Sequence, residues 1–246
     1  MKEEPVRGIN GLWSTFRQGG MPSAIASVMG APTAQHMAFI RSLMREQRRP
    51  EILSVPLTKL ETVVFDLETT GFAHQHGDEI LSFGAVRMVG EEIIEEEQFY
   101  SLVNCRNPVP DHITSLTGIT QEMTDGAPTL MNGLHSFMSF VGGRVLIAHA
   151  SAHDKAFLNA ALWKTSKVNL GHRVMDTMMI ARWLEPQREG YGLDELLMDR
   201  GIPIQGRHHA LEDAMMTAKL WKSYLNDISN RRVDTLGDLY AHLSHS

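Results

Sequence analysis

The chain has 246 residues, of which 43% are hydrophobic and 21% are charged, a balance that supports one ordinary globular domain plus an extension. A formal net charge of −6 argues against a surface coated in cations for binding duplex nucleic acid. Because Cys105 is the single cysteine, an intramolecular disulfide and a thiolate metal cluster are both excluded.

Residues 1–58 are predicted to form a helical N-terminal extension that ends in a linker. Apolar residues spaced by three or four positions predict a helix over residues 33–49, and residues 50–58, which hold two prolines, are interpreted as the linker. The N-terminus, MKEEPVRGIN, has acids where a secretory signal is basic, and no apolar run approaches the roughly 20 residues that cross a bilayer. We therefore predict a cytoplasmic protein with no membrane partner.

Strand and helix patterns alternate along the remaining chain. Only two residues separate the second predicted strand from the third, which favours an antiparallel hairpin after the first strand. Strands are predicted within residues 62–71, 79–89, 92–103 and 145–148 and from residue 173. Helices are predicted over residues 111–116, 129–141, 151–164, 177–183, 192–201, 210–226 and 233–243, with a turn at 117–120.

Two acids lie one residue apart in the stretch TVVFDLETTG. Because side chains i and i+2 of a strand share a face, Asp66 and Glu68 project together, while Phe65 and Leu67 face the other way. Carboxylates that repel each other in an apolar strand are typical of a cation site. The alternative is a strand end that emerges into water, and Asp-x-Glu is a short and common string.

Two further acids each head an apolar helical stripe. Asp154 shares a helix face with Phe157, and Asp213 shares one with Met216. A carboxylate on an inward stripe needs a partner or a metal, although an acid in a first turn is also favoured by the helix dipole. Asp176 is interpreted instead as the cap of the helix that follows it.

These four carboxylates, without cysteine ligands, favour a hard cation such as Mg²⁺ or Mn²⁺, and their combined charge suits two ions. Two such ions can activate water for in-line attack on a phosphodiester. A histidine with a pKa near its usual ~6.5 is suited to accept the proton of that water. His208 and His209 both lie shortly before Asp213, and spacing does not choose between them.

Three motifs, in this order, resemble those of the DEDDh group of 3′-to-5′ exonucleases. They are FDLETTG, LIAHASAHDKAFL and RHHALEDAMMTA. The sequence is nearest in character to the proofreading exonucleases of bacterial DNA polymerase III, of the epsilon and PolC types, and TGITQEMTDGAPT resembles the epsilon-like branch. Two positions depart from the family pattern, because Ala150 stands where Asn is usual and His153 where Phe is usual.

The resemblance implies an α/β, RNase H-like fold. In such a fold the first three strands of a mixed sheet are antiparallel, parallel strands follow, and helices flank the sheet. We expect the exonuclease domain over residues 59–228, the helical extension before it, and a helical tail over residues 229–246.

The resemblance also assigns roles to single residues. It implies that two Mg²⁺ or Mn²⁺ ions are held by Asp66, Glu68, Asp154 and Asp213. His208 becomes the general base, and His209 falls at a variable position. Contacts with the substrate are implied for Thr69, Thr70, Gly71 and His149.

We therefore predict a metal-dependent 3′-to-5′ exonuclease that releases nucleoside monophosphates from a single-stranded or frayed 3′ end. DNA is favoured over RNA, and a DNA polymerase or a repair complex is the expected partner. One alternative is an exoribonuclease in the style of oligoribonuclease or RNase T, whose pocket accepts the 2′-hydroxyl. Another is a non-catalytic module that binds nucleic acid or a polymerase, which the intact set of acids and His208 disfavours.

Overall fold

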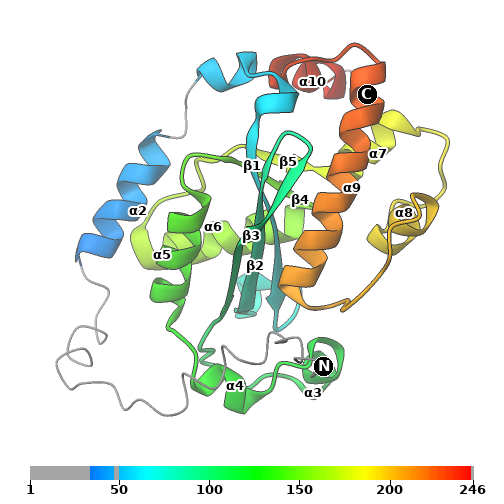
Figure 1. Ribbon diagram of the computed structural model, residues 1–246. Coiled ribbons are helices and arrows are strands. Elements are labelled where there is room, and N and C mark those ends of the chain that lie inside the picture. The colour runs from blue at the N-terminus through cyan, green and yellow to red at the C-terminus, as the bar shows by residue number, and fades with distance from the viewer. Residues whose placement is uncertain (1–33, 47–49, 245–246) are drawn as a thin grey trace, which may run out of the picture. The chain divides into compact units, whose positions relative to one another are not determined.

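A mixed sheet of five strands, in the order β3-β2-β1-β4-β5, is the centre of the fold (Figure 1). The computed structural model describes residues 34–46 and 50–244. The strands are β1 (Glu61–Thr69), β2 (Ile80–Val89), β3 (Glu92–Leu102), β4 (Val145–Ala148) and β5 (Val174–Asp176). β1, β2 and β3 pair antiparallel, whereas β4 and β5 run parallel to β1. This arrangement confirms the predicted fold class.

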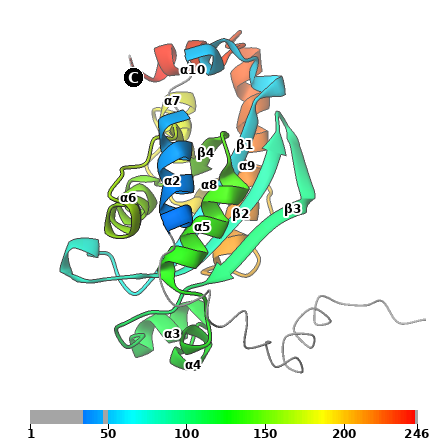
Figure 2. The same ribbon diagram turned by 90° about the vertical axis from the view of Figure 1, so that its left-hand side faces the viewer.

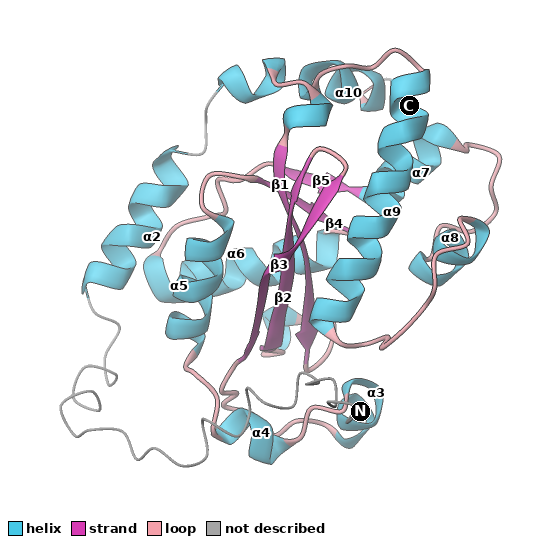
Figure 3. Ribbon diagram, viewed as in Figure 1, coloured by secondary structure: helices cyan, strands magenta, loops and turns pink. Residues whose placement is uncertain are grey.

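Helices cover both faces of the sheet, as Figure 2 and the helix colouring of Figure 3 show. One face packs against α2 (Ala34–Glu46), α5 (Leu130–Val141) and α6 (Ala152–Ser166). The other packs against α7 (Thr177–Leu184), α8 (Leu193–Asp199), α9 (Ala210–Asn230) and α10 (Leu236–Leu243). The short helices α3 (Asp111–Thr117) and α4 (Gln121–Asp125) complete the described set.

The alternation of β1 decides which side chains meet which helices. Phe65 and Leu67 lie in the core beneath α5 and α6, whereas Val64 lies in the core beneath α9. Asp66 and Glu68 follow Val64 at intervals of two and therefore face α9. The predicted separation of the two acids from their apolar neighbours is confirmed.

Three segments differ from their predicted form. Helix α4 has no predicted counterpart, because five residues capped by the Thr120 hydroxyl are too short to show a helical period. The segment interpreted as a linker forms two 3₁₀ helices, Pro50–Ser54 and Leu57–Lys59. The loop predicted after the first strand contains a third 3₁₀ turn, His74–His76.

The linker segment and the C-terminal tail pack together on the core. The Leu57 backbone N–H donates to the Asp234 carbonyl at 2.8 Å, and Pro56 forms an isolated β-bridge with Thr235. Buried Leu57 belongs to the same core as Leu236 of α10. The domain boundaries at residues 58 and 228 remain predictions. Residues 1–33 of the extension expected over residues 1–58 lie outside the described residues, as do residues 47–49 of the predicted first helix.

Gly84 allows α9 to begin directly above the sheet. It pairs with Asp66 on one side and with Tyr100 on the other. A Cβ atom at residue 84 would lie 2.1 Å from the backbone carbon of Ala210, the first residue of α9. Because glycine otherwise weakens a strand interior, this close approach explains its presence in an apolar strand. The contact places the first turn of α9 over Asp66.

We predict that Gly84→Ala destabilises the protein, because the added methyl group must push α9 away from β2. The expected loss in free energy of unfolding is about 1–3 kcal/mol, as for other overpacked sites, measured by urea denaturation. Gly133→Ala is the matched control: its Cβ would meet Val103 Cγ2 at an ordinary 3.4 Å, and alanine favours the helix. Equal stability of the two variants would contradict the proposed role of Gly84.

Candidate metal centre and active site

Three acids converge on one point between β1 and α9. Each of Asp66, Glu68 and Asp213 offers an oxygen, and these atoms all lie within 4.8 Å of one another. In the pairing of β1 with β2, Asp66 lies opposite Gly84 and Glu68 lies opposite Ser82. Both partners are small residues, which leaves space for α9. Asp213 is in the first turn of α9, and it and Glu68 are buried. Oxygen ligands so arranged can hold a divalent cation.

Asp154 lies beside this trio but is not a member of it. It is in the first turn of α6, is 4% exposed, and accepts a hydrogen bond from the backbone N–H of Leu67. Leu67 lies on the part of β1 that extends beyond Val64, the last residue paired with β4. The Asp154 carboxylate thus replaces a strand partner there. Its charge also raises the pKa of Asp66, second only to the effect of burial.

Burial and mutual repulsion raise the pKa of Asp66, Glu68 and Asp154. Burial, with the charge of Asp213, raises the pKa of Glu68 to about 7. Burial is also the main cause that raises the pKa of Asp154 to about 8 and that of Asp66 well above its usual value. Carboxylates in one dry space cannot all ionise near neutral pH without a cation to offset their charge. The donor set therefore fits a divalent metal.

Asp176 positions the turn that leads into Asp154. Its Oδ1 accepts from the Met178 N–H at 2.8 Å, which confirms the predicted helix cap. The same carboxylate accepts from the backbone N–H groups of Ala150 at 3.0 Å and Ser151 at 2.8 Å. Ala150 has a positive φ of 52°, a conformation that asparagine tolerates better than alanine. The departure at Ala150 therefore falls on a position where its backbone is strained.

The turn after Glu68 is held by its own side chains. The Thr70 hydroxyl donates to Asp78 Oδ1 at 3.0 Å and accepts from the Glu79 N–H at 2.9 Å. The Thr69 hydroxyl donates to the Gly71 carbonyl at 2.7 Å, and a Cβ at Gly71 would lie 2.4 Å from the Asp78 carboxylate. Because both hydroxyls are used inside the turn, its backbone is what it offers to a ligand.

The two histidines of the second motif each lie within hydrogen-bond distance of a threonine hydroxyl. His153 Nε2 lies 3.3 Å from the Thr69 hydroxyl, and its ring meets the edge of Phe72, a side chain that is 89% exposed. His149 Nδ1 lies 2.9 Å from the Thr177 hydroxyl. Burial lowers the pKa of both His149 and His153, which favours neutral rings at neutral pH.

The two histidines before α9 have different surroundings. The His209 ring stacks on Tyr100 with 4.5 Å between ring centroids. His208 has a positive φ of 63°, and its backbone N–H donates to Asp213 Oδ2 at 2.9 Å. Within the described part of the chain the His208 ring makes no hydrogen bond, and the buried Nδ1 of His209 has no partner either, so the stack on Tyr100 is what distinguishes the two rings.

Three contributors to the site were not predicted. Gly84 and the second role of Asp176 are described above, and the third is Arg207, whose guanidinium bonds to Asp213 Oδ1 and to Asp194 Oδ1. The isolated glycine in an apolar strand was a usable signal of close backbone approach. No comparable signal marks Arg207, because its partners depend on how α8 and α9 pack.

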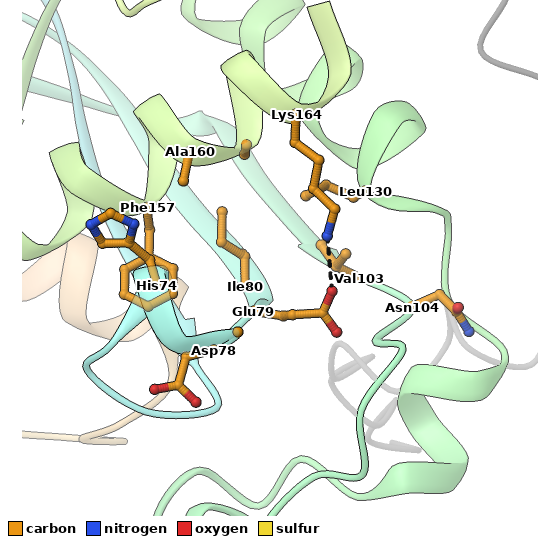
Figure 4. Close-up of a pocket in the computed structure, with 12 residues that line it drawn as sticks. His74, Asp78, Glu79, Ile80, Val103, Asn104, Leu130, Phe157, Ala160 and Lys164 are labelled. Carbon is orange, nitrogen blue, oxygen red and sulfur yellow. Dashed lines mark hydrogen bonds and ion pairs between the residues drawn. The ribbon is translucent and has the colours of Figure 1, made fainter.

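A separate pocket lies under α6, beside the loop between β1 and β2 (Figure 4). Lys164 of α6 reaches Glu79 there, with 3.1 Å between Nζ and Oε1. Glu79 Oε2 also accepts from the Arg106 backbone N–H at 2.7 Å. None of the four acids lines this pocket, so it is distinct from the candidate metal centre.

Comparison with known proteins identifies the family. The profile of the exonuclease family (RNase_T) matches residues 63–221. PolC-type DNA polymerase III of Clostridium perfringens is 38% identical over 184 residues, which cover 73% of this chain and 12% of that protein. A DNA polymerase III subunit epsilon-like protein of Rhodobacter capsulatus is 36% identical over 188 residues, which cover 76% of this chain and 27% of that protein. The chain belongs to the exonuclease family.

Solved structures support the fold. Exonuclease X in complex with 5′ overhanging duplex DNA matches with a TM-score of 0.54 and 21% identity, covering 69% of this chain and 93% of that one. The nuclease domain of 3′hExo, a DEDDh family member bound to rAMP, matches with a TM-score of 0.59 and 22% identity, covering 68% and 92%. The predicted resemblance to DEDDh exonucleases and to the PolC and epsilon types is confirmed.

Among the residues that the structure describes, no helix is both long enough and apolar enough to span a bilayer.

We predict that the metal-free protein loses stability as pH rises from 6.5 to 8.5. The folded state keeps protons on Glu68 and Asp154, with pKa values of about 7 and about 8, that the unfolded state has already released. Stability is therefore highest below these values and falls as pH rises through them, by up to about 1.4 kcal/mol per pH unit for each such proton. Thermal unfolding in chelator measures the effect.

Asp154→Asn is the matched variant for this test. It removes one of the titrating groups and should make the decline clearly shallower. Histidines with lowered pKa values act in the opposite sense but below about pH 6.5, outside the tested window. A melting temperature that rises with pH in wild-type protein would contradict the raised pKa values.

Proposed function

We propose that the chain is a metal-dependent 3′-to-5′ exonuclease that removes nucleoside monophosphates from a single-stranded or frayed 3′ end of DNA. The proposal rests on the convergence of Asp66, Glu68 and Asp213 within 4.8 Å, next to Asp154, in a member of the exonuclease family. The chain spans 12% and 27% of the two curated relatives described above, so its activity as an independent protein is part of the proposal.

The proposed metal ligands are Asp66, Glu68, Asp154 and Asp213. Carboxylate oxygens without thiolates favour Mg²⁺ or Mn²⁺, and the charge of four carboxylates suits two ions. When bound, such ions supply an activated water and offset the negative charge that develops on the phosphodiester. The raised pKa values of Asp66, Glu68 and Asp154 support a site built for added positive charge.

His208 is the proposed general base. It lies in the loop just before α9, and its backbone N–H donates to Asp213 Oδ2, which holds the proposed base next to a proposed metal ligand in the chain fold. We place the terminal nucleotide against the backbone of Thr69, Thr70 and Gly71 and beside His149. The internal use of the threonine hydroxyls supports a backbone contact there.

DNA is the proposed substrate because curated relatives are DNA polymerase III proteins and several fold neighbours were solved with DNA. Another neighbour recognises the 3′ end of a histone mRNA stem-loop, which keeps an RNA substrate as the second candidate. A DNA polymerase or a repair complex is the proposed partner. The cytoplasmic location stays a prediction.

End-labelled single-stranded DNA, RNA and mismatched duplex, each with Mg²⁺, Mn²⁺ or chelator, test the proposal. We expect stepwise release of mononucleotides from the 3′ end of DNA with either metal and none with chelator. Asp66→Asn should lower turnover at least about 100-fold while the protein stays folded, because one proposed ligand loses its charge. Turnover that persists in chelator, or in Asp66→Asn, would count against the metal assignment.

For His208→Ala we expect a rate loss of roughly 10² to 10⁴, the usual contribution of a general base. His209→Ala is the control: it removes the stack on Tyr100 and should lower stability more than rate. If the rate loss belongs to His209→Ala alone, the general base is assigned to the wrong histidine.

A further inference from the structure

Arg207 places a positive charge among the acids of the candidate metal centre. Its guanidinium donates to Asp213 Oδ1 through Nη1 and to Asp194 Oδ1 through Nε, the latter at 2.5 Å. Its charge counteracts the raised pKa values of Asp66 and Glu68, so it is close enough to act on all three acids of the trio. Arg207 thus provides part of the compensation that the carboxylates require.

Both oxygens of Asp213 are engaged in this arrangement. Arg207 donates a hydrogen bond to Oδ1, and the backbone N–H of His208 donates one to Oδ2. A divalent ion bound by Asp213 would share this oxygen set with Arg207 and would repel its guanidinium at short range. Arg207 and a metal ion therefore compete for the same carboxylate.

Asp194 is a second ion-pair partner for Arg207. It lies on α8, outside the trio of candidate ligands, and its side chain is 52% exposed, compared with 5% for Asp213. An arginine that leaves Asp213 can keep its charge paired at Asp194 without crossing apolar surface. Asp213 and Asp194 are thus a buried and an exposed ion-pair partner for the same guanidinium.

We propose that Arg207 occupies the acidic centre of the metal-free enzyme and moves fully to Asp194 when a divalent metal binds. The Arg207–Asp194 pair then sets the metal affinity. This inference rests on the metal site of the proposed function. Because His208 follows Arg207 and is bonded to Asp213, the same movement couples metal binding to the position of the proposed base.

A simpler interpretation is a permanent ion pair. In that case the contact between Arg207 and Asp213 anchors the loop before α9, and metal binds with Arg207 still in place. The two interpretations differ in the role of Asp194. If Arg207 moves, Asp194 favours the metal-bound state by receiving the displaced guanidinium, but only while Arg207 is present.

Titration calorimetry of the metal-stripped full chain with Mn²⁺, without nucleic acid, distinguishes a moving Arg207 from a permanent ion pair. Arg207→Gln removes the competitor and should bind Mn²⁺ at least about tenfold more tightly, a change of about 1.4 kcal/mol. Asp194→Asn removes the exposed ion-pair partner of Arg207 and should bind Mn²⁺ about threefold more weakly. The double variant should bind like Arg207→Gln alone. Arg45→Gln, an exposed change of equal charge far along the chain, should bind like wild type.

Two results would overturn the proposal. One is an unchanged or weaker affinity in Arg207→Gln. The other is an effect of Asp194→Asn that is the same with and without Arg207, which is the result expected for a permanent pair. Should Arg207→Gln fail to fold, Asp194→Asn still decides, because it changes a side chain that is 52% exposed and an unchanged or tighter affinity contradicts the movement.

The nuclease assay is kept separate from this binding test. Tighter Mn²⁺ binding by Arg207→Gln in a protein that cleaves no nucleic acid supports the inference and rejects the proposed function. Metal-dependent cleavage combined with unchanged Mn²⁺ affinity in Arg207→Gln rejects the inference and leaves the proposed function intact. Absence of Mn²⁺ binding in both wild type and Arg207→Gln rejects the inference together with the metal site.

Discussion

Repulsion between buried carboxylates is the constraint on which this structure depends. Asp66, Glu68 and Asp213 come within 4.8 Å of one another, and Asp154 stands close enough to raise the pKa of Asp66 further. An arrangement of this kind opposes folding unless positive charge or protons compensate it. The carboxylate cluster therefore lowers the stability of the fold, and a bound divalent cation would offset this loss.

Several local features hold the acids in this unfavourable arrangement. Glycine at residue 84 lets α9 approach β2 closely enough for Asp213 to reach the strand. Asp176 holds the backbone at Ala150 and Ser151, which starts α6 where Asp154 meets the N–H of Leu67. The cores on both sides of the sheet anchor these elements, so the energy that keeps the carboxylates together comes from apolar burial elsewhere.

The sequence was sufficient for those parts of the site that follow from local periodicity. The strand period places Asp66 and Glu68 on one face, and the helical period places Asp154 and Asp213 on inward stripes. The antiparallel pairing of the first three strands and the parallel strands after them were also predicted, because the hairpin spacing and the family motifs agree. Helix α4 was missed since it has no full period, and the packing of residues 50–58 on α10 was missed since both partners are short.

Contacts between distant segments could not be predicted in the same way. The stack that distinguishes His209 from His208 is made with Tyr100, which lies on β3 and is more than 100 residues away. In the sequence Arg207 is indistinguishable from an ordinary surface cation, because its partner Asp194 lies on α8 and meets it only in the folded chain. In both cases the chemistry of the residue is visible in the sequence, whereas its partner is decided by the tertiary fold.

Crystals soaked in Mn²⁺ and measured for anomalous scattering test the central claim most directly, because they locate the ions without reference to activity. The account predicts two anomalous peaks bounded by the carboxylates of Asp66, Glu68, Asp154 and Asp213. Full Mn²⁺ occupancy elsewhere, with no peak among these four side chains, would contradict it.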